Sequence, residues 1–172
     1  MKDIINIVCD EGATSRVVIG SVEENFESLL PGGTPRIIIV TDAKVHANNL
    51  AFVNAHEHIV IGQGESSKTF VKLEEVYRQL LHMGADRSTF IVGMGGGIVT
   101  DVTGFVASTY MRGVRFGFLP TTLLAQVDAS IGGKNGVNLD GYKNIIGVFN
   151  QPEFVLCDPE LLSSLPDREF RA

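Results

Sequence analysis

The chain has few of the features that mark membrane, secreted or nucleic-acid-binding proteins. No apolar run reaches the ~20 residues that span a bilayer, and the N-terminus has no signal-peptide pattern. Lys and Arg number 14 against 20 Asp and Glu, a formal net charge of −6. Because such a field repels nucleic acid and anionic membranes, we expect neither as a partner. An anionic ligand would need local cationic side chains.

Cysteine is scarce as well, with only Cys9 and Cys157 in the chain. Each lies at or near an apolar, strand-like run. A disulfide between them is one alternative. We expect two reduced thiols in the core, which is typical of a cytoplasmic protein.

Short apolar runs that alternate with amphipathic segments dominate the rest of the chain. Hydrophobic residues make up 44% and charged residues 20% of the 172, which suits one globular domain with a real core. Runs without polar alternation predict strands covered on both faces, at 17–19, 37–40, 59–61, 90–92, 116–119 and 154–157. Helical spacing between them predicts helices over 22–30 and 70–81, the second ended by Gly84. This alternation favours an α/β fold with βαβ units on a parallel sheet.

The last third of the chain is rich in turns. Glycines and Asn or Asp residues after Ser130 predict a short hairpin around Asp140-Gly141. Asp158 is a good N-cap with Pro159 at the first helical position, which predicts a short helix through Leu165.

Two polar clusters carry the functional signal. The first is a glycine-rich loop at 93–97 followed by Asp101, and the second is the segment 120–134 with two hydroxyls, a carboxylate, a Gly-Gly turn and Lys134. Glycine-rich turns let backbone N–H groups approach a phosphate, and a helix that begins near Gly97 adds partial positive charge. The loop lacks the third glycine of the dinucleotide fingerprint, where Ile98 stands, and such loops also form without a ligand. Together the clusters predict a nucleotide site beside a second, charged site.

These segments resemble the N-terminal half of the 3-dehydroquinate synthase family, one of the sugar phosphate cyclases. The resemblance runs from about Thr41 to the end of the chain. Its blocks are 95–101, 107–113, 120–134 and Lys143-Asn144. The first block alone is shared with metal-dependent alcohol and glycerol dehydrogenases, whereas four blocks in order are specific. The Gly132-Gly133-Lys134 segment resembles the dehydroquinate branch.

The resemblance implies a Rossmann-like NAD-binding domain over residues 1–165, the N-terminal domain of a two-domain fold. Residues 166–172 would begin a helical second domain that is absent from this chain. It implies a cytoplasmic, homodimeric lyase of the shikimate pathway to aromatic amino acids. The reaction converts 3-deoxy-arabino-heptulosonate 7-phosphate to 3-dehydroquinate and phosphate through transient oxidation by NAD, phosphate elimination, re-reduction and aldol cyclisation. A divalent metal, zinc or cobalt, polarises the hydroxyl that is oxidised. Because the family's metal ligands lie beyond this chain, we expect no metal site and no activity from the chain alone.

Cofactor contacts carry over from the family residue by residue. Asp42 corresponds to the contact with the adenosine ribose, where a carboxylate favours NAD over NADP. Lys44 stands where many relatives have Asn, and Ser164 where Thr is commoner. The implied NAD contacts are Asp42, Lys44, Gly64, Glu65, Lys68, Gly96, Gly97, Asp101, Thr121, Thr122, Leu124, Lys134, Lys143, Leu161, Ser164, Leu165 and Glu169.

Substrate contacts carry over in the same way. Asp128, Lys134 and Asn144 correspond to residues that touch the substrate, and Arg112 to one that reaches its phosphate. A phosphorylated hydroxy acid needs cationic donors, and Arg and Lys suit phosphate. Asn135 replaces the usual Thr after the lysine, which alters local hydrogen bonding.

Simpler interpretations stay open at several of these positions. Glu65 and Lys68 have the spacing of a solvated ion pair at a helix start, and Arg112 that of surface charge beside a strand. The segment 56–58, His-Glu-His, has the pattern of a metal chelate on a strand edge, but we expect a polar loop that leads into a strand. Two other functions also remain possible. One is a metal-dependent polyol dehydrogenase that accumulates NADH, and the other is a nucleotide-binding module without catalysis.

Overall fold

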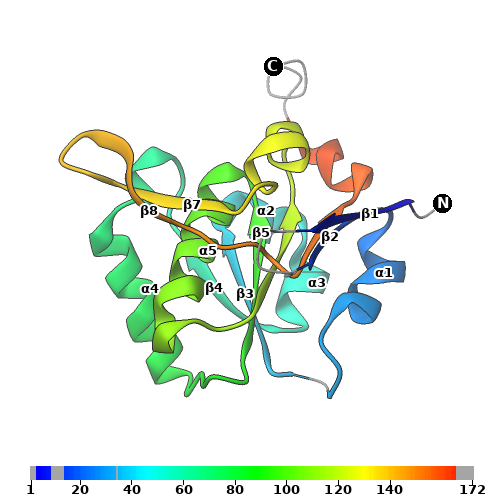
Figure 1. The fold of residues 1–172 in the computed structure, drawn as a ribbon, viewed down its shortest axis with the longest axis horizontal. Helices are drawn as coiled ribbons and strands as arrows, with labels where there is room; N and C mark the ends of the chain where they lie inside the picture. Colours follow the sequence, from blue (N-terminus) through cyan, green and yellow to red (C-terminus); the bar gives the residue numbers. More distant parts are fainter. Residues whose placement is uncertain (1–2, 9–13, 34, 166–172) are drawn as a thin grey trace.

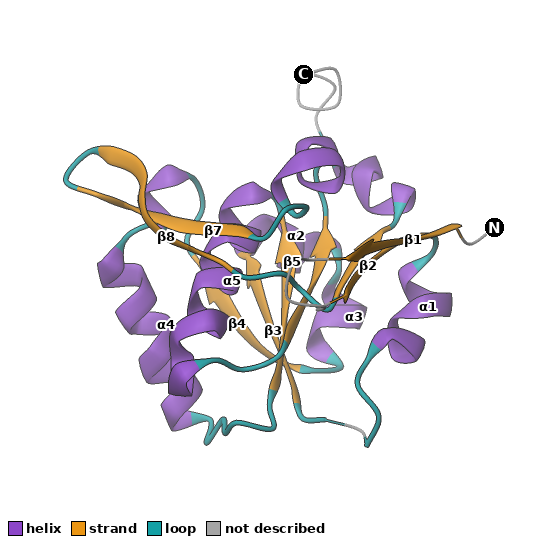
Figure 2. Ribbon diagram, in the orientation of Figure 1, coloured by secondary structure: helices purple, strands orange, loops and turns teal. Residues whose placement is uncertain are grey.

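The computed structural model of the protein describes residues 3–8, 14–33 and 35–165. It is a layered α/β domain (Figures 1 and 2). In chain order the elements are β1 (Asp3–Val8), β2 (Thr14–Ile19), α1 (Val22–Leu29), β3 (Ile37–Asp42), α2 (Ala43–Asn48), α3 (Leu50–Asn54), β4 (Glu57–Ile61), η1 (Glu65–Ser67), α4 (Phe70–His82), β5 (Phe90–Gly95), α5 (Gly97–Thr109), η2 (Tyr110–Arg112), β6 (Phe116–Pro120), η3 (Ala125–Ala129), β7 (Lys134–Leu139), β8 (Tyr142–Phe149), β9 (Phe154–Cys157) and η4 (Pro159–Ser164).

The main sheet has seven strands in the order β1-β2-β9-β6-β5-β3-β4. All neighbours pair in parallel except β1 and β2. From β3 the chain passes to β4 at one edge, then returns through α4 to β5 on the other side of β3. The strand order therefore reverses between β3 and β5. In open α/β sheets such a reversal leaves a crevice at the carboxyl ends of the two strands, where ligands bind.

Two hydrophobic clusters cover the two faces of the sheet. Ile38 and Ile91 belong to the cluster under α4 and α5, whereas Ile39 and Phe90 belong to the cluster under α1 and α3. This division follows the alternation of side chains along a strand. The predicted strands are confirmed, and β3, β5, β6 and β9 are covered on both faces. The prediction of two covered faces is wrong for 59–61, because β4 is an edge strand on which Val60 is 38% exposed. The Rossmann-like parallel sheet is therefore confirmed.

The predicted helices are confirmed with small differences. Helices α1 and α4 begin and end within one residue of the predicted ranges, and Gly84 has a φ of 69° where the chain leaves α4. The segment after Asp158 is a 3₁₀ helix, capped by the Asp158 carboxylate on the Glu160 N–H at 2.9 Å. Several elements have no counterpart in the sequence prediction: the antiparallel edge strand β1, the short helices α2 and α3, the 3₁₀ turn η2 and the π-helical turn η3.

Strands β7 and β8 form the predicted hairpin, which lies apart from the main sheet (Figure 1). Its turn is Asp140-Gly141, both at positive φ, 49° and 83°, as the two-residue turn of a hairpin requires. Helix α5 packs directly under β7. At its base the buried Asn135 amide donates to the carbonyls of Gly133 and Asn150, both at 2.9 Å. The replacement of Thr by Asn thus holds the two ends of the hairpin together.

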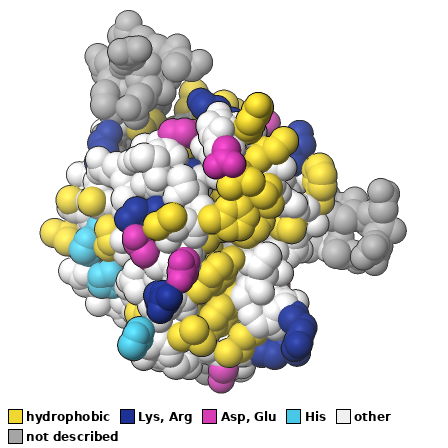
Figure 3. All heavy atoms as spheres, turned by 90° about the vertical axis from the view of Figure 1, so that its left-hand side faces the viewer, with side chains coloured by type: hydrophobic (Ala, Val, Ile, Leu, Met, Phe, Trp, Pro, Cys, Tyr) yellow, Lys and Arg dark blue, Asp and Glu magenta, His cyan; other side chains and the backbone are white. Residues whose placement is uncertain are grey.

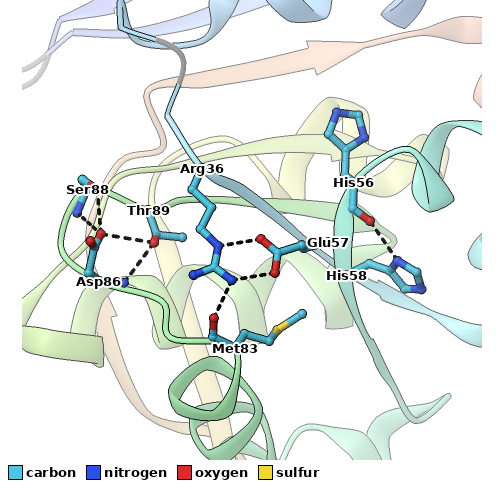
Figure 4. A network of polar contacts seen from close by, with 8 residues as sticks. All are labelled: Arg36, His56, Glu57, His58, Met83, Asp86, Ser88 and Thr89. Carbon is cyan, nitrogen blue, oxygen red and sulfur yellow. Dashed lines mark hydrogen bonds and ion pairs between the residues drawn. The ribbon is translucent and has the colours of Figure 1, made fainter.

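Arg36 ties together the amino ends of the strands, opposite the crevice (Figure 4). It precedes β3 and pairs with Glu57, the first residue of β4, while donating to the Met83 carbonyl after α4. The Glu57 of the His-Glu-His segment is therefore engaged by an arginine. Within the described ranges, no group of three His, Cys, Asp or Glu side chains is placed to hold a metal ion.

Large apolar side chains remain exposed on the hairpin and α4. Phe149 is 85% exposed, Tyr142 70% and Val71 68%. Apolar atoms gather in a band on this side of the molecule (Figure 3). Among the residues described, no helix is both long and apolar enough to cross a bilayer.

We predict that Gly104→Ala destabilises the domain, although Ala is the better helix former. A Cβ at position 104 of α5 would lie 1.7 Å from Asn135 Oδ1, so helix and hairpin would have to separate. The expected loss is about 1–3 kcal/mol in urea denaturation. Gly32→Ala is the control, because its Cβ meets nothing within 4 Å, and it should change stability by less than about 1 kcal/mol. Equal stability of the two variants would contradict the close packing of α5 on β7.

We also predict that Cys157 is unreactive in the folded chain. It is a free, buried thiol, whereas Cys9 lies outside the described residues. Burial raises the pKa of the Cys157 thiol to about 11. A Cys9→Ser chain should react with an aromatic disulfide at pH 8 at least about 100-fold more slowly when native than in urea. Rapid labelling of the native chain would show that β9 is less well covered.

Candidate functional site

A cavity of about 300 Å³ lies in the crevice where the strand order reverses. Asp42 lines it from the end of β3, Gly96 and Gly97 from the loop after β5, and Thr121 and Thr122 from the loop after β6. Gly64 and Leu165 also line it. The structure thus brings seven of the predicted cofactor residues together, with Lys44 as the eighth. Further lining residues that the sequence analysis missed are Val45, Asn48, Gly62, Gln63, Ile98 and Val99.

The glycine loop delivers the N-terminus of a 13-residue helix, α5, to this cavity. No side chain caps the helix at Gly96, so its first N–H groups are available to an anion. The loop also needs its glycines for space. A Cβ at Gly95 would lie 2.5 Å from Val99, and one at Gly96 would lie 3.0 Å from Thr122 Cγ2. The cavity therefore has the features of a phosphate site.

Asp42 is held in place by the helix that it begins. Its Oδ1 accepts hydrogen bonds from the N–H groups of Lys44 at 2.8 Å and Val45 at 3.0 Å. Both bonds use the same oxygen, so Oδ2 is left for a ligand in the cavity. A fixed carboxylate at the end of β3 suits the hydroxyls of a ribose.

A buried polar cluster lies beside the glycine loop. The Lys68 side chain, only 5% exposed, pairs with Asp101 of α5 and also donates to Asn144 Oδ1 of β8. Burial raises the pKa of Asp101 above its usual range, and Lys68 counteracts part of this effect. Lys68 is therefore not the solvated partner of Glu65, whose carboxylate accepts from Asn138 at 2.6 Å. The solvated-pair interpretation of Glu65 and Lys68 is wrong.

A second cavity, of about 490 Å³, opens between α5 and the hairpin. Asp101, Asp128, Lys134 and Asn144 line it. Three of the four predicted catalytic residues thus share one cavity. Gly97 lines the first cavity and Asp101, one helical turn further along α5, lines the second. The two cavities are therefore neighbours on the same helix.

The π-helical turn η3 presents Asp128 to the second cavity. Its anchor is the buried Gln126, whose Nε2 donates to the carbonyls of Pro120 at 3.1 Å and Asp158 at 2.8 Å. Single π-turns frequently occur at functional sites because they turn a side chain out of the helical pattern. Gln126 was not predicted, because a lone glutamine in an apolar stretch carries no local signal.

Some predicted residues lie elsewhere. Arg112 is exposed at a φ of 70° after α5 and lines neither cavity. Leu124, Lys143 and Leu161 line neither cavity as well. The side chain of Ser164 is not described. Glu169 and the predicted start of a second domain at 166–172 lie outside the described residues.

Comparison with known proteins agrees with this geometry. The family model for 3-dehydroquinate synthase N-terminal regions matches residues 58–172. A 3-dehydroquinate synthase from Solibacter usitatus is 43% identical over 170 residues, which cover 95% of this chain and 46% of that protein. The chain thus spans less than half of the length of this curated relative.

Two solved structures share both the fold and part of the sequence with this chain. A 2-deoxy-scyllo-inosose synthase, complexed with carbaglucose-6-phosphate, NAD⁺ and Co²⁺, has a TM-score of 0.86 and 28% identity over 97% of this chain and 49% of its own. A 2-epi-5-epi-valiolone synthase from Streptomyces hygroscopicus, with NAD⁺ and Zn²⁺ bound, has a TM-score of 0.77 and 30% identity over 90% of this chain and 46% of its own.

We predict that Lys68→Met destabilises the domain at pH 7 by about 3–5 kcal/mol, because it leaves the buried Asp101 carboxylate without a counter-charge. Urea denaturation at pH 7 measures this. Glu75→Gln, which breaks the exposed pair with Lys72, is the control and should cost less than about 1 kcal/mol. Equal effects would mean that the Asp101 carboxylate reaches water.

The pH dependence provides a second check. The raised folded-state pKa means that stability from Asp101 is present below the unfolded value, about 3.9. It declines as pH rises through the folded pKa. This decline should be absent from the profile of Asp101→Asn.

Proposed function

Since this chain belongs to the 3-dehydroquinate synthase family, we propose that it is the NAD-binding domain of an enzyme that forms 3-dehydroquinate and phosphate from 3-deoxy-arabino-heptulosonate 7-phosphate. One observation carries the proposal. The phosphate-type cavity and the charged cavity adjoin along α5, so that a cofactor in the first would reach a substrate in the second. The reaction needs this arrangement, because the cofactor must meet a phosphorylated substrate.

We propose that NAD binds in the first cavity with its adenosine end at Asp42. Asp42 would accept from the adenosine ribose hydroxyls, and the N–H groups at Gly96 and Gly97 would hold the pyrophosphate. The nicotinamide ribose would then lie near Asp101, with the ring directed past Thr121 and Thr122 toward the second cavity. When bound, NAD supplies the hydride acceptor for the alcohol and returns the hydride before release. The NAD⁺ bound in the two related synthases supports NAD as the cofactor.

The residues of the second cavity suit the phosphorylated substrate. Lys134 is the cationic donor that a phosphate requires, and its position after Gly132 and Gly133 directs it into the cavity wall. Asp128 and Asn144 would orient the substrate hydroxyls by accepting and donating hydrogen bonds. Once the alcohol is a ketone, the neighbouring C–H is acidic, so that its proton can pass to the phosphate group as a C=C bond forms and the C–O bond to phosphate breaks. Lys134 would stabilise the negative charge of the leaving phosphate.

The metal is not provided by the described residues, which offer no suitable group of ligands. In the proposed enzyme, a zinc or cobalt ion is held by residues outside this chain, and the chain alone does not turn over substrate. The exposed Ile145 and Phe149, which also line the second cavity, would then face that further part of the protein.

The remaining proposals concern the cellular setting. We propose a cytoplasmic homodimeric lyase of the shikimate pathway. Arg112, exposed beyond α5 and outside both cavities, would act in a contact with the second copy. A polyol dehydrogenase is the rival activity, and its products differ. A protein that continues beyond residue 172 should release phosphate without accumulating NADH, whereas a dehydrogenase accumulates NADH.

We predict that the 172-residue chain binds NAD in a calorimetric titration, and NADP more weakly. Asp42→Asn keeps a side chain able to cap α2 but loses the charge that bonds the ribose. It should weaken NAD binding by about 10- to 100-fold, the range for hydrogen bonds to a charged group. Glu74→Gln, on the exposed side of α4, is the control and should bind as the parent does. A folded chain that fails to bind NAD would contradict the cofactor assignment.

A further inference from the structure

Asn138 lies where the hairpin meets the loop before α4. Its backbone N–H donates to the Lys68 carbonyl at 2.9 Å, and Thr69 and Asn138 form an isolated parallel bridge. The backbones of the hairpin and of the 65–69 segment therefore meet at this strand position. Both neighbours of the attachment, Glu65 and Lys68, are proposed cofactor contacts.

The hairpin is irregular opposite Asn138. Val137 pairs with Ile146 and Leu139 with Tyr142, so the three residues 143–145 of β8 oppose the single residue 138 of β7. The middle residue of this bulge, Asn144, has a φ of 52°. A bulge redirects side chains away from the regular alternation of a strand. Here it redirects Lys143 and Asn144, both of which the family resemblance assigns to ligand contacts.

The Asn138 side chain occupies the middle of this bulge. Its Oδ1 accepts from the Asn144 N–H at 2.9 Å, and its Nδ2 donates to Glu65 Oε1 at 2.6 Å. The amide thus replaces the backbone partner that the bulge takes from Asn144. Making both hydrogen bonds requires one acceptor and one donor on the same short side chain. Neither Asp nor Leu meets this requirement.

Asn138, Asn144 and Lys68 are joined in a closed set of hydrogen bonds that lies between the two cavities. Asn144, held by Asn138, accepts from Lys68, and Lys68 pairs with Asp101. Asp101 and Asn144 line the second cavity, whereas Glu65 follows Gly64, which lines the first. A change at position 138 would therefore move ligand-facing groups without touching either cavity, because Asn138 lines neither.

We propose that Asn138 is a positioning residue, which sets the conformation of the 143–145 bulge and thereby the contact of Asn144 with Lys68 between the cofactor and substrate cavities. Its link to ligand binding rests on the proposed function. Its structural effect at Asn144 does not.

The test compares Asn138→Leu, of similar size, with the parent chain by amide hydrogen exchange resolved at single residues. The Asn144 amide should exchange at least about tenfold faster in the variant, the equivalent of one lost hydrogen bond. Amides of β5 and β6 should be unchanged. Asn150→Leu is the matched control, because the Asn150 side chain donates to Ser108 at 2.9 Å at the other end of the hairpin. It should leave Asn144 exchange as it is in the parent.

A reversed hydrogen bond tests the Glu65 contact. Asn138→Asp keeps the acceptor for Asn144 but places a second carboxylate against Glu65. Glu65→Gln restores a donor, now on residue 65. Asn144 exchange should be accelerated by Asn138→Asp alone and slowed again by about tenfold in the double variant. NAD should bind more weakly to the Asn138→Leu chain than to the parent, and the titration of the parent separates loss of positioning from a wrong cofactor assignment.

Unchanged Asn144 exchange in a folded Asn138→Leu chain would overturn the proposal. Equal acceleration of exchange across the whole domain would also overturn it, because Asn138 would then serve only general stability. Absence of NAD binding by the parent chain, together with the expected exchange at Asn144, would contradict the cofactor assignment and leave the positioning role supported.

Discussion

The close packing of α5 between the sheet and the hairpin is the constraint on which both cavities depend. Three positions without side chains permit it. A Cβ at Gly93 would lie 2.9 Å from Thr103, one at Gly95 would lie 2.5 Å from Val99, and one at Gly104 would lie 1.7 Å from Asn135. Because α5 packs this closely on β5, the N-terminus of the helix reaches the crevice and Asp101 lines the second cavity. Strand β7 packs on the opposite face of α5.

Positive charge is concentrated locally in a chain whose net charge is negative. A chain of net charge −6 repels anions in general, yet the proposed ligands are a dinucleotide and a phosphorylated acid. Backbone N–H groups at Gly96 and Gly97 and the lysine at 134 supply local positive charge. Lys68 is buried against Asp101, and such pairs add little net stability because of the cost of desolvation. The role of Lys68 is therefore structural. Its ammonium group connects the 65–69 segment to Asp101 of α5 and to Asn144 of the hairpin.

Much of the fold was predictable because its signals are local. Unbroken apolar runs such as 37–40 and 90–92 identify strands buried on both faces, and their alternation with amphipathic helices dictates a parallel sheet. The hairpin turn at Asp140-Gly141 and the cap at Asp158 were predictable for the same reason. Edge strand β1 was not, because its polar and apolar residues form no clear pattern and its pairing with β2 is a tertiary event. The π-turn at 125–129 was missed because it differs from an α-helix only in which carbonyl each N–H reaches.

The sequence by itself determined the α/β class, the glycine loop at the start of α5 and the membership of ligand-type residues in four ordered blocks. Only the tertiary structure decided which of those residues meet. It turned Lys68 inward to Asp101 and Asn144, which are 33 and 76 residues away, and placed Arg112 outside both cavities. It also made Asn138 the partner of Glu65 and Asn144. The physical reason is that hydrogen bonds and ion pairs form between groups close in space, and chain separation of this length leaves no periodic trace in the sequence.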